Sequence, residues 1–197
     1  MNWLKQKGIS KKAKSSKQNA FERFIKKPKH VVEKMTACLA MDCEFVGVTE
    51  RDINFLARVS IVNYDGQVVY DQYVRPHLKV KNFRSKISGI YKNHLKKGID
   101  FTICRAKVAE IIDGRILIGH SIDSDLSVLN LKHPRELTRD TSTKESTLCP
   151  NNKRSLKKLV YEHFNSNIQT KSHCPIEDAR ATLQLYKLVE KKWGQIS

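Results

Sequence analysis

The sequence predicts an α/β domain in which helices cover a mixed sheet. Three apolar segments follow one another between residues 36 and 76, and Asp65-Gly66 between the second and third is a typical hairpin turn. Segments with helical and strand patterns alternate along the rest of the chain, as in sheets that are covered by helices. At 197 residues the chain has the length of one ordinary domain with a substantial core.

Each predicted element rests on its apolar pattern and on the residues that bound it. The continuous apolar run 36–48 predicts a buried strand, and the segments 53–65 and 67–76 continue it as a meander. The segment 83–98 is predicted to be a loop. Further strands are predicted at 115–119 and 136–141, and helices at 102–114, 122–131, 154–164 and 175–193. Gly114 is a helix stop signal, and Pro175 with the acids after it marks a helix start.

The strong positive charge of the chain predicts a polyanionic partner. The sequence holds 37 basic and 20 acidic residues, for a formal net charge of +17. Nucleic acid is the first candidate for such a partner, and an anionic membrane surface is the second. No apolar stretch is long enough to span a membrane, and no signal-peptide core is evident. Five cysteines without paired spacing indicate free thiols in a reducing compartment rather than a zinc site.

The N-terminal part of the chain has a composition of its own. Residues 1–30 contain ten Lys or Arg and one acid, Glu22. We therefore expect residues 1–34 to be a basic, flexible extension and residues 35–197 to form the domain. Such an extension can be a nucleic-acid arm, a nuclear address or a solubilising tail. Phe21, Phe24 and Ile25 could form a short helical anchor onto the domain.

Asp42 and Glu44 are two acids inside the apolar strand segment 36–48. Residues two apart share a face of a strand, so both carboxylates point the same way, while Met41, Cys43 and Phe45 are expected to point into the core. Two close like charges repel, and partial burial increases the repulsion. One interpretation is a strand with one solvated face. The other is a site where a basic residue, a shared proton or a metal ion compensates the charge.

Two further acids occupy inward faces of predicted helices. Asp125 shares a helical face with Ile122 and Leu129, whereas Asp123 is expected to be solvated. Asp178 stands at the head of the packing stripe of the last helix, where it could also serve only as a partner of the helix dipole. His173 lies in the preceding loop. Carboxylates collected in this way are ligands for Mg²⁺ or Mn²⁺, and two such ions would support phosphodiester hydrolysis.

Three segments of the chain resemble the three motifs of the DEDDh 3′-to-5′ exonucleases: MDCEF, GHSIDSDL and HCPIEDARATLQLY. The tracts LARVSIVN, YDQYVRP and FRSKISGI are similar to the RNA exonuclease 4 group, which is close to the interferon-stimulated 20 kDa exonucleases. The resemblance covers residues 38 to about 193. It implies a ribonuclease H-like exonuclease fold with a mixed five-stranded sheet flanked by helices.

The resemblance also implies roles for the acids. Asp42 and Glu44 match the first motif, Asp125 matches the second, and His173 and Asp178 match the third. The four carboxylates would hold two Mg²⁺ or Mn²⁺ ions, and His173 would take a proton from the attacking water. All five residues are therefore expected to be catalytic. Neighbouring carboxylates are expected to raise the pKa of His173, and bound metal ions to lower it again.

Four further residues are expected to contact the substrate through the same resemblance: Phe45, Val46, Arg84 and His120. Phe45 stands where the family usually has Met, so stacking on the terminal base is expected to differ. The loop VTERDIN is shorter than in the family, which affects contacts at the edge of the substrate. Arg84 matches a residue near the ribose 2′-hydroxyl in relatives, which favours RNA; it could also be an ordinary surface Arg.

These observations predict a metal-dependent 3′-to-5′ exoribonuclease that releases 5′-mononucleotides. We expect a monomer that acts in the nucleus or nucleolus, in ribosomal RNA processing, with RNA and pre-ribosomal particles as partners and no membrane. Three alternatives remain: a DNA exonuclease for repair or degradation, a catalytically idle RNA-binding ribosome-assembly factor, and a protein of the membrane surface. The complete set of acids disfavours the idle factor, and the lack of an amphipathic stripe in the N-terminal segment disfavours the last.

Overall fold

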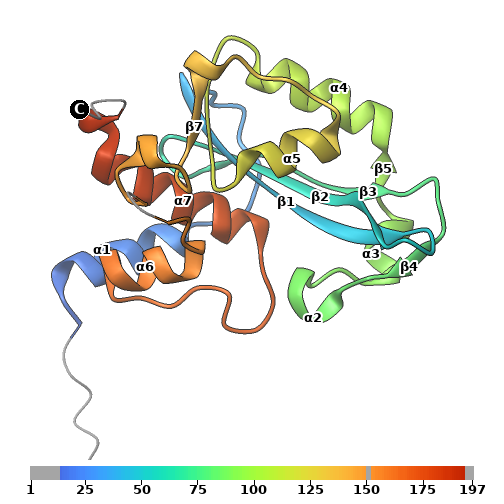
Figure 1. The fold of residues 1–197 in the computed structure, drawn as a ribbon, viewed down its shortest axis with the longest axis horizontal. Helices are drawn as coiled ribbons and strands as arrows, with labels where there is room; N and C mark the ends of the chain where they lie inside the picture. The colour runs from blue at the N-terminus through green and yellow to red at the C-terminus, as the bar shows by residue number, and fades with distance from the viewer. Residues whose placement is uncertain (1–13, 150–151, 194–197) are drawn as a thin grey trace, which may run out of the picture.

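The structure is a computed structural model that describes residues 14–149 and 152–193. Its centre is a mixed sheet with strand order β5-β3-β2-β1-β6-β7, and β4 pairs with the far end of β1 (Figure 1). The strands are β1 (Cys38–Val48), β2 (Ile53–Asn63), β3 (Val68–Arg75), β4 (Val80–Asn82), β5 (Ile99–Asp100), β6 (Ile116–Gly119) and β7 (Thr138–Asp140).

The strand pairing confirms the predicted mixed sheet. β1, β2 and β3 form an antiparallel meander, and β6 and β7 add to it in parallel beside β1. The turn between β2 and β3 contains Asp65 and Gly66, and Gly66 has a φ of 76°, a conformation that glycine adopts without strain. The five predicted strands are all present. The short strands β4 and β5 are additions, because segments of two or three residues carry no readable alternation.

Helices cover both faces of the sheet (Figure 1). One face packs against α4 (Phe101–Ile112) and α5 (Ile122–Leu129) through a core that includes Leu39, Met41 and Cys43 of β1. The other face packs against α7 (Pro175–Val189), which contacts β1, β2 and β6. Two further helices, α1 (Ser16–Ile25) and α6 (Leu156–Phe164), pack on α7. Short 3₁₀ turns occur at Arg135–Leu137, Lys144–Ser146 and Glu190–Lys192.

The segment 83–98, predicted to be a loop, contains two short helices. These are α2 (Ser85–Ser88) and α3 (Lys92–Lys96), and both lie beside the end of the meander. Helices of four and five residues are too short to show an apolar period, which explains why the pattern missed them. α2 begins after Arg84, whose φ of 50° is left-handed, so the chain turns sharply there.

The N-terminal segment differs from the flexible extension expected for residues 1–34. Residues 1–13 lie outside the described residues, but the described part packs on the domain. α1 buries Phe21 and Ile25, and the ring of Phe21 stacks on that of Phe164 with centroids 4.3 Å apart. The anchor predicted from these apolar residues is confirmed. The polar composition of residues 1–34 gave no sign that this segment packs on the domain. Three apolar residues on one face of α1 are enough for that packing.

No helix among the described residues combines the length and the apolar character that a membrane crossing requires.

Candidate active site

Strand β1 places the first two acids on the face that α7 covers. In the register with β2, Asp42 lies opposite Ser60 and Glu44 opposite Arg58. Glu44 is buried, with 5% of its surface exposed, and Asp42 is half-buried. The predicted shared face of the two carboxylates is therefore confirmed.

A β-bulge interrupts the pairing of β1 with β2 directly after Glu44. Glu44 pairs with Arg58 and Phe45 pairs with Leu56, so Ala57 of β2 is the extra residue. Val46, which strict alternation would place beside Glu44, is fully buried in the core of the opposite face instead. Its side chain does not line the cavity described below, and the expected substrate contact of Val46 stays a prediction. Phe45 remains half-buried and lines the cavity.

Helix α7 supplies Asp178 in its first turn. The carboxylate is buried, with 2% exposed, and its Oδ2 accepts a hydrogen bond of 3.1 Å from Gln169 Nε2. Its Oδ1 is buried and has no hydrogen-bond partner among the described residues. A buried oxygen without a donor is costly unless a ligand completes it. An interaction with the dipole of α7 alone therefore does not explain why Asp178 is buried with an unsatisfied oxygen.

His173 lies directly before α7, in a loop that is fastened to α2. Its backbone N–H donates a hydrogen bond of 2.6 Å to Ile87 O. Its ring Nδ1 is 3.8 Å from Asp178 Oδ2, and its side chain is 37% exposed. The loop that carries His173 therefore folds back over Asp178.

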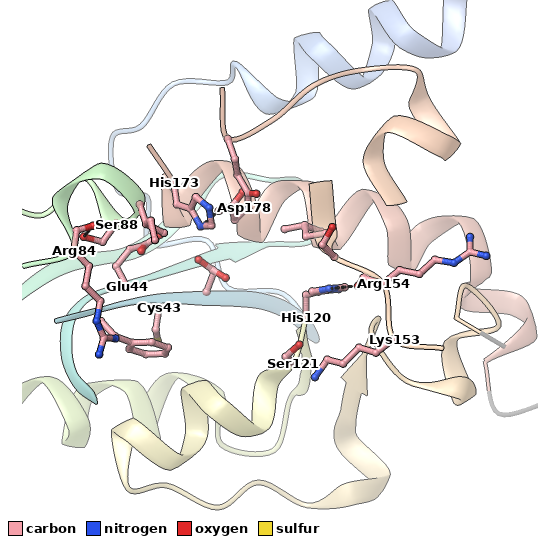
Figure 2. A pocket seen from close by; sticks show the side chains of 16 residues that line it. Cys43, Glu44, Arg84, Ser88, His120, Ser121, Lys153, Arg154, His173 and Asp178 are labelled. Carbon is pink, nitrogen blue, oxygen red and sulfur yellow. Dashed lines mark hydrogen bonds and ion pairs between the residues drawn. The ribbon is translucent and has the colours of Figure 1, made fainter. Parts of the chain in front are cut away.

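These side chains meet in a cavity of about 620 Å³ between β1, α2 and the start of α7 (Figure 2). Figure 2 shows Glu44, His173 and Asp178 converging there, with Arg84 on one side of the cavity and Lys153 on the other. The lining also includes several residues from other segments: Asp42, Ile87, Ser88, His120, Ser121, Arg154 and Gln169. The cavity is therefore acidic at its floor and basic at its sides.

The donor atoms fit a divalent cation. Glu44, His173 and Asp178 each offer one ligand atom, and these atoms all lie within 4.8 Å of one another. Asp42 borders the same cavity without belonging to this closest group. Carboxylate oxygens with one imidazole nitrogen suit Mn²⁺ or Mg²⁺, and the unpartnered Asp178 Oδ1 is a free ligand atom.

Asp125 lies apart from the other three acids. It is buried on α5 with 5% exposed, as its helical face predicted, while Asp123 is exposed. The side chain of Asp125 does not line the cavity, whereas Cys43 of β1 does. Its charge nevertheless raises the pKa values of Asp42 and Glu44, so it is electrostatically part of the site.

Burial and mutual repulsion make the acids weak. Burial raises the pKa of Asp42 well above its usual range, and the charges of Asp178, Asp125 and Glu44 raise it further. Burial and Asp178 raise the pKa of Glu44 to about 8, against an opposing effect of Arg58. The pKa of Asp178 rises to about 7, mainly through burial. Without a cation the cluster therefore holds protons at neutral pH, and a bound cation would displace them.

The pKa of His173 departs from the expectation. Burial lowers it below its ordinary value, and the positive charge of Lys157 lowers it further. The expected increase from neighbouring carboxylates is absent, because those carboxylates hold protons themselves in the metal-free site. The imidazole is therefore neutral at neutral pH and able to accept a proton.

Two residues expected to contact substrate are engaged with the protein. His120 directly follows β6. Its ring shares hydrogen bonds of 2.9 Å with Thr141 Oγ1 and with the carbonyl of Arg154, so it links the backbone at Arg154 to the end of β6. Arg84 donates 2.6 Å to Asn54 Oδ1 and pairs with Asp52 at 3.0 Å. Both line the cavity, and their positions are set before a substrate arrives.

Gln169 and Arg58 are among the residues at the site that sequence reasoning missed. Gln169 is the hydrogen-bond donor to Asp178, but it lies in an irregular loop with a left-handed φ of 54° and no pattern to reveal it. Arg58 lies opposite Glu44 and forms two hydrogen bonds of 2.8 Å with Asp71. Pairing the segments 36–48 and 53–65 residue by residue would have found Arg58.

Comparison with known families and proteins agrees with this geometry. The exonuclease family RNase T matches residues 39–186. RNA exonuclease 4 of Saccharomyces cerevisiae is 45% identical over 162 residues, which cover 80% of this chain and 56% of that protein. Interferon-stimulated 20 kDa exonuclease-like 2 of Bos taurus is 42% identical over 165 residues, covering 80% of this chain and 47% of that protein. The chain thus spans about half the length of these relatives.

Solved structures show the same fold. The catalytic unit of Neurospora crassa Pan2 superposes with a TM-score of 0.72 at 24% identity, over 84% of this chain and 28% of that one. The Saccharomyces cerevisiae Pan2 module in complex with AAGGAA RNA gives a TM-score of 0.73 at 25% identity, over 85% of this chain and 32% of that one.

Proposed function

The chain belongs to the RNase T family of exonucleases, and on that premise we propose that it is a metal-dependent 3′-to-5′ exoribonuclease that releases 5′-mononucleotides. The observation that carries the proposal is the buried acid cluster in the cavity. Its acids repel one another, one Asp178 oxygen has no hydrogen-bond partner within residues 14–149 and 152–193, and a neutral imidazole lies 3.8 Å from the other oxygen.

The residues divide the chemistry between them. Asp42, Glu44 and Asp178, which line the cavity, would hold two Mg²⁺ or Mn²⁺ ions together with Asp125, whose charge acts on Asp42. When bound, such ions lower the pKa of water and stabilise the leaving oxygen. His173 accepts the proton of the attacking water, because its ring is neutral and borders the cavity. The phosphorus–O3′ bond then breaks, and the shortened chain leaves with a new 3′-hydroxyl.

The walls of the cavity orient the 3′ end of the substrate. Phe45 offers an aromatic surface to the terminal base, which is a common mode of single-strand recognition. Arg84 is held by the β1–β2 loop with its side chain at the cavity, where it can meet the ribose or a phosphate. Lys153 and Arg154 provide positive charge on the opposite side.

RNA is favoured over DNA as the substrate. RNA exonuclease 4 of Saccharomyces cerevisiae, 45% identical to this chain, carries RNA in its name, and the Pan2 module was solved with RNA. The test uses one sequence as RNA and as DNA, labelled at the 3′ or the 5′ end, with Mn²⁺ or a chelator. A 3′-label released as mononucleotide from RNA, only with metal, is expected. Equal rates on DNA would favour the DNA exonuclease, and binding without cleavage would favour the idle RNA-binding factor.

The cellular setting is a further part of the proposal. A nuclear or nucleolar location, a role in ribosomal RNA processing and association with pre-ribosomal particles fit the net charge of +17. A monomeric state is also part of the proposal. Imaging of a tagged chain and light scattering of the purified protein test location and oligomeric state, respectively.

A further inference from the structure

A second hollow lies beyond the active site, between the end of β3, β4 and α3. It has a volume of about 310 Å³, and it shares no lining residue with the active-site cavity. Its apolar surface comes from Val80, Phe83 and Leu95, of which Phe83 and Val80 are half-buried. We call it the β4–α3 groove. Figure 1 shows β4 and α3 next to one another at the end of the meander.

Four exposed cations surround this apolar surface, and no acid lines it. Arg75 ends β3, Lys79 precedes β4, and Lys92 and Lys96 lie one turn apart on the same face of α3. None of the four takes part in the ion pairs formed among the described residues. These four side chains therefore leave their charge available for a ligand.

The groove is connected to the active site through the chain itself. Phe83 lines the groove, and the next residue, Arg84, lines the active-site cavity. β4 pairs with β1 at Gly47 and Val48, only three and four residues past Glu44. At about 3.3 Å per residue this separation is roughly 10 Å, which a short single strand of nucleic acid can span.

We propose that the β4–α3 groove binds single-stranded RNA upstream of the 3′ end that is being cleaved. The inference rests on the proposed function, since it gives the same substrate a second contact. Cations that attract phosphates beside an aromatic ring on which a base can stack form the usual surface for single strands. Lys92 and Lys96 contact phosphates, and Phe83 offers its ring to a base. The groove thereby favours longer substrates over short ones.

The test compares two double variants that each remove two positive charges. One is Lys92→Gln with Lys96→Gln in the groove. The matched control is Lys191→Gln with Lys192→Gln, two exposed lysines in the last 3₁₀ turn. The probes are fluorescent oligouridylates of about 3 and about 12 nucleotides, chosen to lie within and beyond the active site. Binding is measured with chelator present, so that no probe is cleaved.

For the long probe, the groove variant should bind roughly ten- to thirtyfold more weakly than wild type at about 0.1 M salt. The slope of log K against log salt should fall by about 1.4, which corresponds to two lost phosphate contacts on a single strand. The short probe and the control variant should show little change. Phe83→Leu should weaken binding of the long probe without changing the slope.

Equal affinity of wild type and groove variant for the long probe would overturn the inference, and would leave the groove for another anionic partner, such as an acidic protein segment. An equal loss on both probes would also overturn it, because the lysines would then act at the active site. Cleavage of the short probe with Mn²⁺ tests the proposed activity separately. If wild type cleaves nothing, that activity fails, while the binding comparison still decides the fate of the groove.

Discussion

Asp178 and Arg180 lie two residues apart on α7, and both are buried. Their side chains differ in how completely the surrounding protein satisfies their hydrogen-bonding groups. Arg180 has no exposed surface and donates hydrogen bonds to four backbone carbonyls, those of Gly66, Ile25, Lys27 and Pro28, at 2.7–3.0 Å. Asp178 accepts one hydrogen bond from Gln169 and leaves its other oxygen without a partner.

The difference separates a structural charge from a functional one. The protein itself completes the shell around Arg180, which ties the β2–β3 turn and the segment after α1 to α7. Around Asp178 the described residues supply further acids and a single side-chain donor, Gln169, and burial raises the pKa of Asp178 to about 7. A buried charge that the fold satisfies stabilises the fold, whereas one that the fold leaves unsatisfied is reserved for a ligand.

Asp178→Asn should have the largest effect, and on activity alone. It keeps the shape of the side chain but removes a metal-binding charge, so turnover should fall by roughly 10³-fold or more. The metal-free variant should be at least as stable as wild type, since one like charge disappears. Single-turnover cleavage and urea unfolding measure the two quantities. Glu177→Gln, one residue away, is the control, and full activity of Asp178→Asn would remove Asp178 from the site.

Arg180→Met should have the opposite signature. It keeps the apolar stem but leaves four buried carbonyls without their donor, so the free energy of unfolding should fall by about 3–5 kcal/mol. Arg105→Met is the control, because Arg105 donates to a single carbonyl at the surface, that of Asn130; it should cost less than about 1 kcal/mol. An equally small loss in both variants would show that Arg180 is not a structural anchor.

His173→Ala should separate proton transfer from metal binding beside Asp178. A positioned general base contributes roughly 10²- to 10⁴-fold, so turnover should fall by about that factor. The pKa of His173 is lowered, so wild-type activity should rise with pH through the range where the imidazole loses its proton. Single-turnover rates across pH and Mn²⁺ affinity check both points. Loss of metal affinity together with activity would make His173 a ligand instead.

Gln169→Met should have the smallest effect. The variant keeps the length of the side chain but removes the hydrogen bond to Asp178 Oδ2, so turnover should fall by about two- to tenfold. The pKa of Asp178 should rise further, because Gln169 lowers it, so the loss should be greater at lower pH. Gln184→Met, further along α7, is the control. A loss that does not vary with pH would indicate a change in packing only.

The sequence revealed those parts of the site that follow from local periodicity. Alternation placed Asp42 and Glu44 on one face, and the helical period placed Asp125 and Asp178 inward, as the structure confirms. Val46 lies in the same core as Met41 and Cys43, which simple alternation along β1 does not predict, and the bulge that Ala57 forms opposite this point has no readable signal in one sequence. Gln169 acts through a loop whose path depends on tertiary packing.

The N-terminal segment shows the same limit on a larger scale. Its charge predicted a flexible extension, which is the correct average for such a composition. The structure instead packs α1 against α6 and α7, and the carbonyls that follow α1 complete the shell of Arg180. Composition describes a segment in isolation. It does not reveal that Arg180 on the distant helix α7 requires the backbone carbonyls of this segment as hydrogen-bond acceptors. The boundary at residue 34 therefore could not be placed from charge alone.

The central claim is that the acid cluster around Asp178 awaits a cation. Titration of the metal-free protein with Mn²⁺ at pH 7, by calorimetry in buffers of different ionisation enthalpy, tests it most directly. Glu44 with a pKa of about 8 and Asp178 with a pKa of about 7 hold protons that the metal must displace. Binding should therefore release at least about one proton per protein at pH 7, and fewer as the pH rises past 8.

The same protonation governs stability. The raised pKa values mean that the folded protein holds protons that the unfolded chain releases, so metal-free stability should fall as pH rises from about 4 to about 8. Saturating Mn²⁺ should remove this decline. Proton release on binding together with a flattened profile is the predicted result; absence of Mn²⁺ binding, or binding without proton release at pH 7, would contradict the claim.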